Sequence, residues 1–128
     1  MQRLLITGSE GQLGKALVKM YPHATAASRK VLDISSADQV EAFDWSGYDV
    51  ILNAAAYVNA DHSETSSGRE VTWAANAIGP CNLARVAMKN NLGLIHFSSE
   101  YVFDGTQKNH DENEPFTPLS VYGETKAA

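Results

Sequence analysis

Four short apolar segments, separated by longer amphipathic ones, set the pattern of this sequence. The apolar segments are residues 3–7, 24–28, 49–53 and 94–98. Three of them are almost continuously apolar, which is typical of strands covered on both faces. The second, made of Ala, Thr and Ser, is weak by itself and gains support from its place in the series. We therefore predict four β-strands.

The segments between these strands have helical spacing. Residues 11–21 form an amphipathic helix, because apolar side chains recur at Leu13, Ala16, Leu17 and Met20. A short helix follows Ser35-Ser36, and a long helical stretch covers 68–91. Gly79-Pro80 should bend or split that stretch, because proline lacks the N–H and clashes with the preceding turn. Alternating strands and helices predict a parallel sheet with right-handed crossovers, and the polar segment 104–118 is a loop.

Composition narrows the class of protein. A chain of 128 residues is long enough for one domain with a buried core. Its net charge of −5 argues against nucleic acid or an anionic membrane as a general partner, and no apolar run is long enough to span a membrane. A single cysteine, Cys81, excludes an internal disulfide and fits a reducing cytoplasm, and its place after Gly79-Pro80 on a helix predicts a buried thiol. The four histidines have no metal-ligand spacing, so we expect no metal.

A glycine-rich turn follows the first predicted strand and precedes the first predicted helix. It reads Gly8-Ser-Glu-Gly11-Gln12-Leu13-Gly14. Gly8 suits a tight turn with positive φ, Gly11 lets a pyrophosphate approach the N–H groups of the helix N-terminus, and Gly14 lets the helix pack closely on the sheet. In this context the turn predicts a dinucleotide site. The alternative is a glycine-rich turn without a ligand.

The segment after the second strand bears on the choice of dinucleotide. An acidic residue there would bind the ribose 2′-OH of NAD, whereas a basic one would accept the 2′-phosphate of NADP. The sequence has Ser28-Arg29-Lys30 and no acid until Asp33. Arg29 suits a phosphate because its guanidinium donates two hydrogen bonds at once. We expect NADPH, with NADH as the alternative cofactor and a solvated basic pair as the alternative interpretation. Asp33-Ile34 would then lie near the adenine.

Five motifs in this order resemble the extended short-chain dehydrogenase/reductases, and most closely the dTDP-4-dehydrorhamnose reductase family. They are the glycine turn, Leu32-Asp-Ile34, Asn53-Ala-Ala-Ala-Tyr57, Ser98-Ser-Glu-Tyr-Val-Phe-Asp-Gly105 and Val121-Tyr-Gly-Glu-Thr-Lys126. The resemblance covers the whole chain. It implies a Rossmann domain followed by a smaller substrate domain, and reduction of the C4 ketone of a nucleotide-linked 6-deoxy sugar by NADPH or NADH.

The resemblance also implies site residues. Ser99, Tyr122 and Lys126 match the catalytic set of the family, and Ser99 with Glu100 would contact the substrate. Two departures are Ser99 in place of the usual Thr, which keeps the hydroxyl, and Glu100 in place of the usual Asp. The cofactor contacts of the family fall on Gly11, Gln12, Leu13, Asp33, Ile34, Ala54, Ala55, Ala56, Tyr57, Val58, Tyr122 and Lys126.

The residues themselves suggest how a ketone would be reduced. Tyr122 can donate a proton to the carbonyl oxygen, and Lys126, four residues later on the same helix face, can supply the positive charge that stabilises the phenolate. Ser99, at the end of the fourth strand, can hydrogen-bond the substrate oxygen. The alternative for the Tyr-Lys pair is an exposed tyrosine and a solvated lysine. Asn76 either braces the site through backbone contacts or is an ordinary polar residue within a helix.

Several expectations concern the protein as a whole. We expect residues 1–128 to be an incomplete N-terminal dinucleotide-binding Rossmann domain, with a doubly wound sheet in the order 3-2-1-4, and to be inactive without the C-terminal substrate domain. A homodimer is an expectation for the full-length protein. Two alternatives stay open for its function. One is another sugar-nucleotide epimerase or dehydratase, although the dehydratase Asp-Glu pair is missing, and the other is a non-catalytic regulatory subunit that binds dinucleotide.

Overall fold

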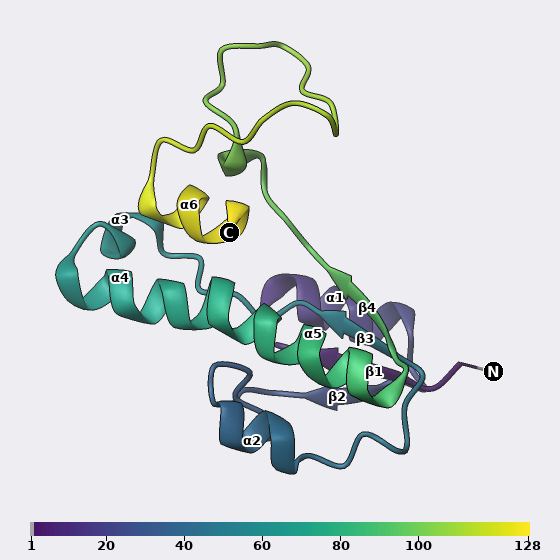
Figure 1. Cartoon of the computed structure of the whole chain (residues 1–128). Helices are drawn as coiled ribbons and strands as arrows, with labels where there is room; N and C mark the ends of the chain where they lie inside the picture. The colour runs from purple at the N-terminus through teal and green to yellow at the C-terminus, as the bar shows by residue number, and fades with distance from the viewer. Residues whose placement is uncertain (1) are drawn as a thin grey trace.

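The computed structural model describes residues 2–128 as a parallel four-stranded sheet with helices on both faces (Figure 1). The strands are short, and all neighbouring pairs run parallel. Ile6 lies opposite Ala26 on one side and opposite Leu52 on the other. The sheet order is β2-β1-β3-β4, with bounds β1 Leu4–Thr7, β2 Thr25–Ala27, β3 Val50–Asn53 and β4 Gly93–His96.

The predicted fold class, a doubly wound parallel sheet of four strands, is confirmed, and the strand order is corrected. The expected order 3-2-1-4 would place β2 inside the sheet and β3 at its edge, whereas β3 pairs with β1 and β2 is the edge strand. The physical reason is burial. Two of the three β2 residues are exposed, but Leu5 and Ile6 of β1 and Ile51 of β3 are fully buried. Strands that are apolar on both faces belong in the interior of a sheet.

Six α-helices surround or extend from the sheet among the described residues. The long predicted helix is continuous, and the expected disturbance at Gly79-Pro80 is a π-helical turn directly before it, so the proline falls in the first turn of α5. The elements are α1 Gln12–Met20, α2 Ala37–Ala42, α3 Ala60–Ser63, α4 Ser66–Trp73, the π-helical segment η1 Ala74–Ile78, α5 Gly79–Asn90, the 3-10 turn η2 Glu100–Val102 and α6 Val121–Ala127.

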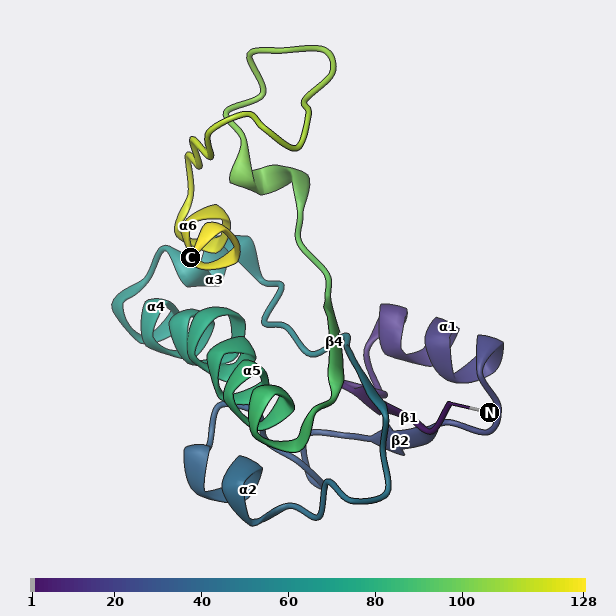
Figure 2. The same ribbon diagram turned by 45° about the vertical axis from the view of Figure 1, so that its right-hand side comes forward.

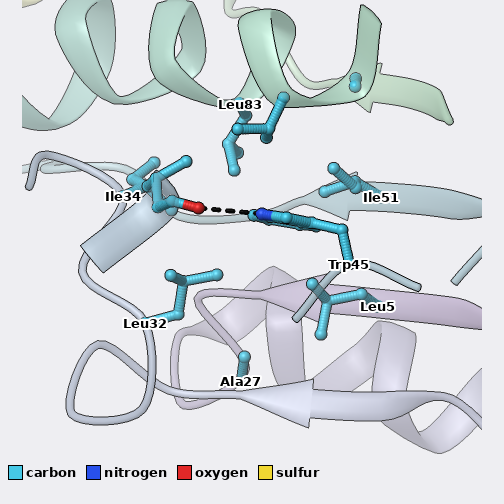
Figure 3. Close-up of a cluster of buried hydrophobic side chains, with 10 residues drawn as sticks. Leu5, Ala27, Leu32, Ile34, Trp45, Ile51 and Leu83 are labelled. Carbon is cyan, nitrogen blue, oxygen red and sulfur yellow. Dashed lines mark hydrogen bonds between the residues drawn. The ribbon is translucent and has the colours of Figure 1, made fainter. Parts of the chain in front are cut away.

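The main core lies between the sheet and the pair α2 and α5, while α1 covers the opposite face (Figures 1 and 2). This arrangement follows from the strand order, because right-handed crossovers that run in opposite directions place their helices on opposite faces. In Figure 3, Leu5, Ile51 and Leu83 enclose Trp45. The indole N–H of Trp45 donates a hydrogen bond of 2.8 Å to the Val40 carbonyl, so its one polar atom is satisfied.

The chain beyond β4 leaves the sheet and forms a projecting loop before it returns as α6 (Figure 2). Within that loop, the ring of Phe103 stacks on His110 at 4.3 Å, and His110 pairs with Glu114. β4 itself is an edge strand, and Ile95 is half exposed. Between residues 2 and 128, no helix combines the length and the apolar character needed to cross a membrane.

Candidate functional site

The glycine turn between β1 and α1 has the geometry that the sequence predicts at two of its three glycines. Gly8 has φ +67°, and a Cβ there would lie 2.5 Å from the Ala55 backbone nitrogen. A Cβ on Gly14 would collide with the Gly8 carbonyl oxygen. At Gly11 the backbone leaves more room, since the nearest atom to an added Cβ is 3.4 Å away. Gly8 and Gly14 therefore allow the turn, the strand and the helix to touch through backbone alone.

The N-terminus of α1 is open to an anion. Gly11 is the N-cap residue and has no side chain to cap the helix, so the first N–H groups of α1 receive no side-chain partner. These groups, in Gln12 and Leu13 among others, carry the positive end of the helix dipole. A phosphate bound at this point could accept hydrogen bonds from these N–H groups, which have no side-chain acceptor.

A first cavity, of about 190 Å³, lies on one side of the glycine turn. Arg29 and Asp33 stand at its wall and form an ion pair with Nε to Oδ2 at 3.0 Å. Burial acts to raise the pKa of Asp33, but hydrogen bonds from Ser35 and Arg29 outweigh it and hold that pKa below its ordinary value. The remaining wall residues are Gly8, Glu10, Gly11, Leu32, Ile34, Ala54, Ala55, Ala56, Tyr57 and Ala75.

A second cavity, of about 600 Å³, lies on the other side of the turn and contains the predicted Tyr-Lys pair. The two cavities adjoin, because they share Glu10, Gly11 and the segment 54–56, and together they are called the cleft at the carboxyl ends of the strands. Such an edge is where open parallel sheets bind ligands. The other residues of the second cavity are Gln12, Leu13, Lys15, Asn53, Val58, Phe97, Ser98, Tyr122 and Lys126.

Tyr122 and Lys126 are carried into the cleft by α6. The ammonium group of Lys126 donates a hydrogen bond to the Phe97 carbonyl just beyond β4, and its burial lowers the pKa of Lys126. The ring of Tyr122 meets that of Tyr101 edge to face at 5.4 Å. Ser120 caps the helix by accepting the N–H of Gly123 at 3.1 Å. Both side chains are thus partly buried, with Lys126 bound to Phe97 and Tyr122 packed against Tyr101.

Ser99 is not among the residues that line the cleft with Tyr122 and Lys126. Its hydroxyl accepts the N–H of Tyr101 at 3.2 Å and donates to Glu100 Oε2 at 3.3 Å. With Glu100 it faces an adjoining hollow that also includes Phe103. Ser98, to which the sequence argument gave no role, is the hydroxyl that lines the second cavity. The role of Ser99 stays a prediction.

Asn76 braces the site, which resolves the choice left open by the sequence. It is buried in the π-helical segment, accepts the N–H of Tyr57 at 2.7 Å and donates to the Tyr57 carbonyl at 3.0 Å. It also donates to the Thr125 hydroxyl at 3.1 Å. One side chain therefore joins the wall of the cleft to the helix that carries Tyr122. Sequence reasoning missed Thr125 as its partner, because only the packing of α6 brings the two together.

A row of polar side chains underlies the cleft at the ends of β1, β3 and β4. The Asn53 carboxamide oxygen accepts the Thr7 hydroxyl at 2.7 Å, and its nitrogen lies 3.0 Å from Nδ1 of His96. Burial, followed by the charge of Lys126, lowers the pKa of His96, which favours the neutral imidazole. Among residues 2–128, no cluster of three or more potential metal ligands occurs.

The fold and the cleft define a Rossmann-like α/β domain. Its cleft lies at the carboxyl ends of the strands, beside the glycine turn. The chain matches, over residues 1–128, the family model described as the RmlD substrate binding domain, and it belongs to that family.

The chain is similar to known reductases. It is 37% identical to the dTDP-4-dehydrorhamnose reductase of Aggregatibacter actinomycetemcomitans and 36% identical to that of Mycolicibacterium smegmatis, in each case over 99% of this chain. A crystal structure of dTDP-4-dehydrorhamnose reductase from Bacillus anthracis in complex with NADP matches 98% of the chain with a TM-score of 0.88 and 31% identity. The chain spans 45%, 40% and 46% of these proteins, respectively.

Proposed function

We propose that this chain is the cofactor-binding part of a reductase that converts the C4 ketone of a nucleotide-linked 6-deoxy sugar, dTDP-4-dehydrorhamnose, to the alcohol of dTDP-L-rhamnose. One observation carries the proposal: the second cavity is lined both by the N-terminus of α1, at Gln12 and Leu13, and by Tyr122 and Lys126. The substrate domain would be supplied by a further C-terminal segment, in keeping with the greater length of the similar reductases.

NADPH fits the residues of the cleft. Gly8 and Gly14 leave a backbone cradle that a side chain would fill, and the α1 N-terminus offers N–H donors for the pyrophosphate. Arg29 is exposed at the far end of the cleft and uses its Nε for Asp33, while its terminal nitrogens form no hydrogen bond within residues 2–128. Those nitrogens can donate hydrogen bonds to the 2′-phosphate that distinguishes NADPH from NADH. NADH, which lacks that phosphate, would bind more weakly.

When bound, the nicotinamide supplies the hydride that reduces the carbonyl carbon. The Tyr122 hydroxyl supplies the proton that the carbonyl oxygen needs as the carbon is reduced. The ammonium group of Lys126 stabilises the phenolate that remains, and solvent returns the proton to Tyr122. The carbonyl of Phe97 holds Lys126 on the wall of the same cavity. Ser98 or Ser99 hydrogen-bonds the substrate oxygen.

Two measurements test the proposal. NADPH and NADH are titrated against the 128-residue chain, and oxidation of NADPH by the full-length protein is followed with dTDP-4-dehydrorhamnose. We expect binding that favours NADPH and turnover that Tyr122→Phe lowers by about 10²- to 10⁴-fold, far more than it weakens NADPH binding. Tyr48→Phe is the matched control, because Tyr48 packs near Phe43 away from the cleft.

The outcomes separate the alternatives. Binding of NADPH without any oxidation, in the full-length protein, would identify a regulatory dinucleotide-binding subunit and refute the reductase. Turnover that Tyr122→Phe leaves unchanged would refute the proton donor but not the reductase. A homodimer and a cytoplasmic location stay predictions of the same proposal.

A further inference from the structure

The first turn of α6 depends on a residue far away in the sequence. Ser120 satisfies the N–H of Gly123, but the N–H of Val121 lies at a helix start and has no acceptor within the helix. Val121 is 3% exposed, so water has little access to this residue. The carboxylate of Glu64 supplies the acceptor, with Oε1 at 2.9 Å from the Val121 nitrogen. A negative group at a helix N-terminus also complements the helix dipole.

The backbone of Glu64 is itself firmly placed. It follows α3 directly, and its N–H donates to the Asp61 carbonyl at 3.2 Å. The preceding residue, Ser63, is fully buried, and its hydroxyl lies 2.8 Å from the Asn59 carbonyl and 2.7 Å from the Thr72 hydroxyl. The turn between α3 and α4 is therefore fixed by buried hydrogen bonds, and Glu64 projects from a rigid support.

That support continues directly from the wall of the cleft. Residues 54–58 line the cleft, Asn59 caps α3, and Glu64 stands at the end of α3. The contact between Glu64 and Val121 thus joins the cofactor-lining segment to the helix of the Tyr-Lys pair. A shift at the start of α6 moves Tyr122 directly, because Tyr122 is the next residue after Val121.

We propose that Glu64 is a positioning residue for the reductase reaction: its carboxylate fixes the first turn of α6 and thereby the placement of Tyr122 and Lys126 in the cleft. The effect of Glu64 on turnover rests on the proposed function. The contact between Glu64 and Val121 does not, and it can be tested without measuring turnover. Glu64 touches neither cofactor nor substrate in this role.

The test uses Glu64→Ala, Glu64→Gln and the control Glu70→Ala. Gln keeps an acceptor oxygen at the same length, and Glu70 is an exposed acid on α4 whose side chain forms no hydrogen bond within the described part of the chain. Hydrogen–deuterium exchange is measured over residues 121–127 of the 128-residue chain. In Glu64→Ala we expect exchange there to rise about tenfold, because a buried N–H loses its acceptor, while exchange in β1 stays unchanged. Glu64→Gln should stay within about threefold of the wild type.

Kinetics of the full-length protein show whether Glu64 acts by placing Tyr122 and Lys126 or only by stabilising the fold. Glu64→Ala should lower kcat about tenfold and raise the KM for NADPH by less than that, because Tyr122 and Lys126 shift while the glycine turn and Arg29 are untouched. Glu64→Gln should recover most of kcat, and Glu70→Ala should change nothing. Unchanged exchange in α6 of Glu64→Ala, or a Gln variant as impaired as the Ala variant, would overturn the proposal. If the wild type binds NADPH but reduces nothing, the proposed function fails and the exchange result alone decides whether Glu64 holds α6.

Discussion

The Asn76 side chain donates a hydrogen bond of 3.1 Å to the Thr125 hydroxyl, although 49 residues separate them. Both residues are almost fully buried. Because Asn76 also holds both backbone groups of Tyr57, one side chain joins three segments: the π-helical segment η1, the wall of the cleft at Tyr57, and α6. Asn76 lies within the π-helical segment η1, and such segments are frequent at functional sites.

Replacing Asn76 with Ala should destabilise the protein by about 3 kcal/mol, because the N–H and carbonyl of Tyr57 would be left without partners in a poorly solvated site. Urea unfolding measures the change. Asn90→Ala is the control, since Asn90 is exposed and forms one hydrogen bond, to the Val86 carbonyl, and we expect less than about 1 kcal/mol there. Equal losses in the two variants would contradict the bracing role.

Gly14→Ala should destabilise the protein by about 3 kcal/mol and abolish measurable binding of NADPH. The added methyl would collide with the Gly8 carbonyl, so α1 must move away from the turn that places its N–H groups. Gly47→Ala is the matched control, because nothing lies within 4 Å of a Cβ at that position. Thermal unfolding and NADPH titration measure the two effects, and a stable Gly14→Ala variant with normal affinity would disprove the close contact.

Arg29→Ala should raise the Kd for NADPH by about tenfold or more and leave the Kd for NADH nearly unchanged, since only NADPH carries the 2′-phosphate. Titration of each cofactor into the variant measures the ratio. Lys30→Ala serves as the comparison, because Lys30 is not among the residues that line the cleft. A similar loss of affinity for both cofactors in Arg29→Ala would show that Arg29 does not bind the 2′-phosphate.

Asp49 should make the protein sensitive to acid. Hydrogen bonds from the Arg3 side chain and backbone lower the pKa of Asp49 from 3.8 to about 2. A carboxyl whose pKa is lower in the folded state stabilises the fold above its unfolded pKa, and this contribution is lost as the pH falls from about 4 to about 2. Asp49→Asn should therefore flatten the dependence of the urea midpoint on pH in that window, whereas Glu70→Gln should not. Parallel curves for wild type and Asp49→Asn would contradict this.

The sequence predicted the fold class because its signals are local. Apolar runs, helical spacing and the glycine turn each identify an element without knowledge of its neighbours, and Gly8 and Gly14 adopt the roles that their positions suggest. The strand order was not available in this way. Whether β3 pairs with β1 or β2 depends on the comparative burial of whole strands, and the polar, exposed β2 belongs at the edge.

The residues of the site that belong to local motifs could be predicted, whereas those that act through distant contacts could not. Tyr122, Lys126 and residues 54–58 line the cleft as their motifs suggest. Thr125 could not be found, because its partner Asn76 is distant in sequence and it belongs to no spacing pattern. Glu64 stands out in the sequence as an acidic residue near a helix start, but its contact with Val121, 57 residues away, could not be foreseen. Cys81, which follows Gly-Pro on a helix and suggested a buried thiol, is exposed, because α5 turns Leu83 and Val86 toward the core instead.

The three hydrogen bonds that fasten α6 reach back 57, 49 and 29 residues along the chain, to Glu64, Asn76 and Phe97. A helix of seven residues is too short to persist alone in water, so α6 depends on its contacts with the rest of the domain. The Tyr-Lys pair therefore keeps its place in the cleft only through residues that lie far away in the sequence. Its order is a property of the whole domain rather than of the seven residues that carry it.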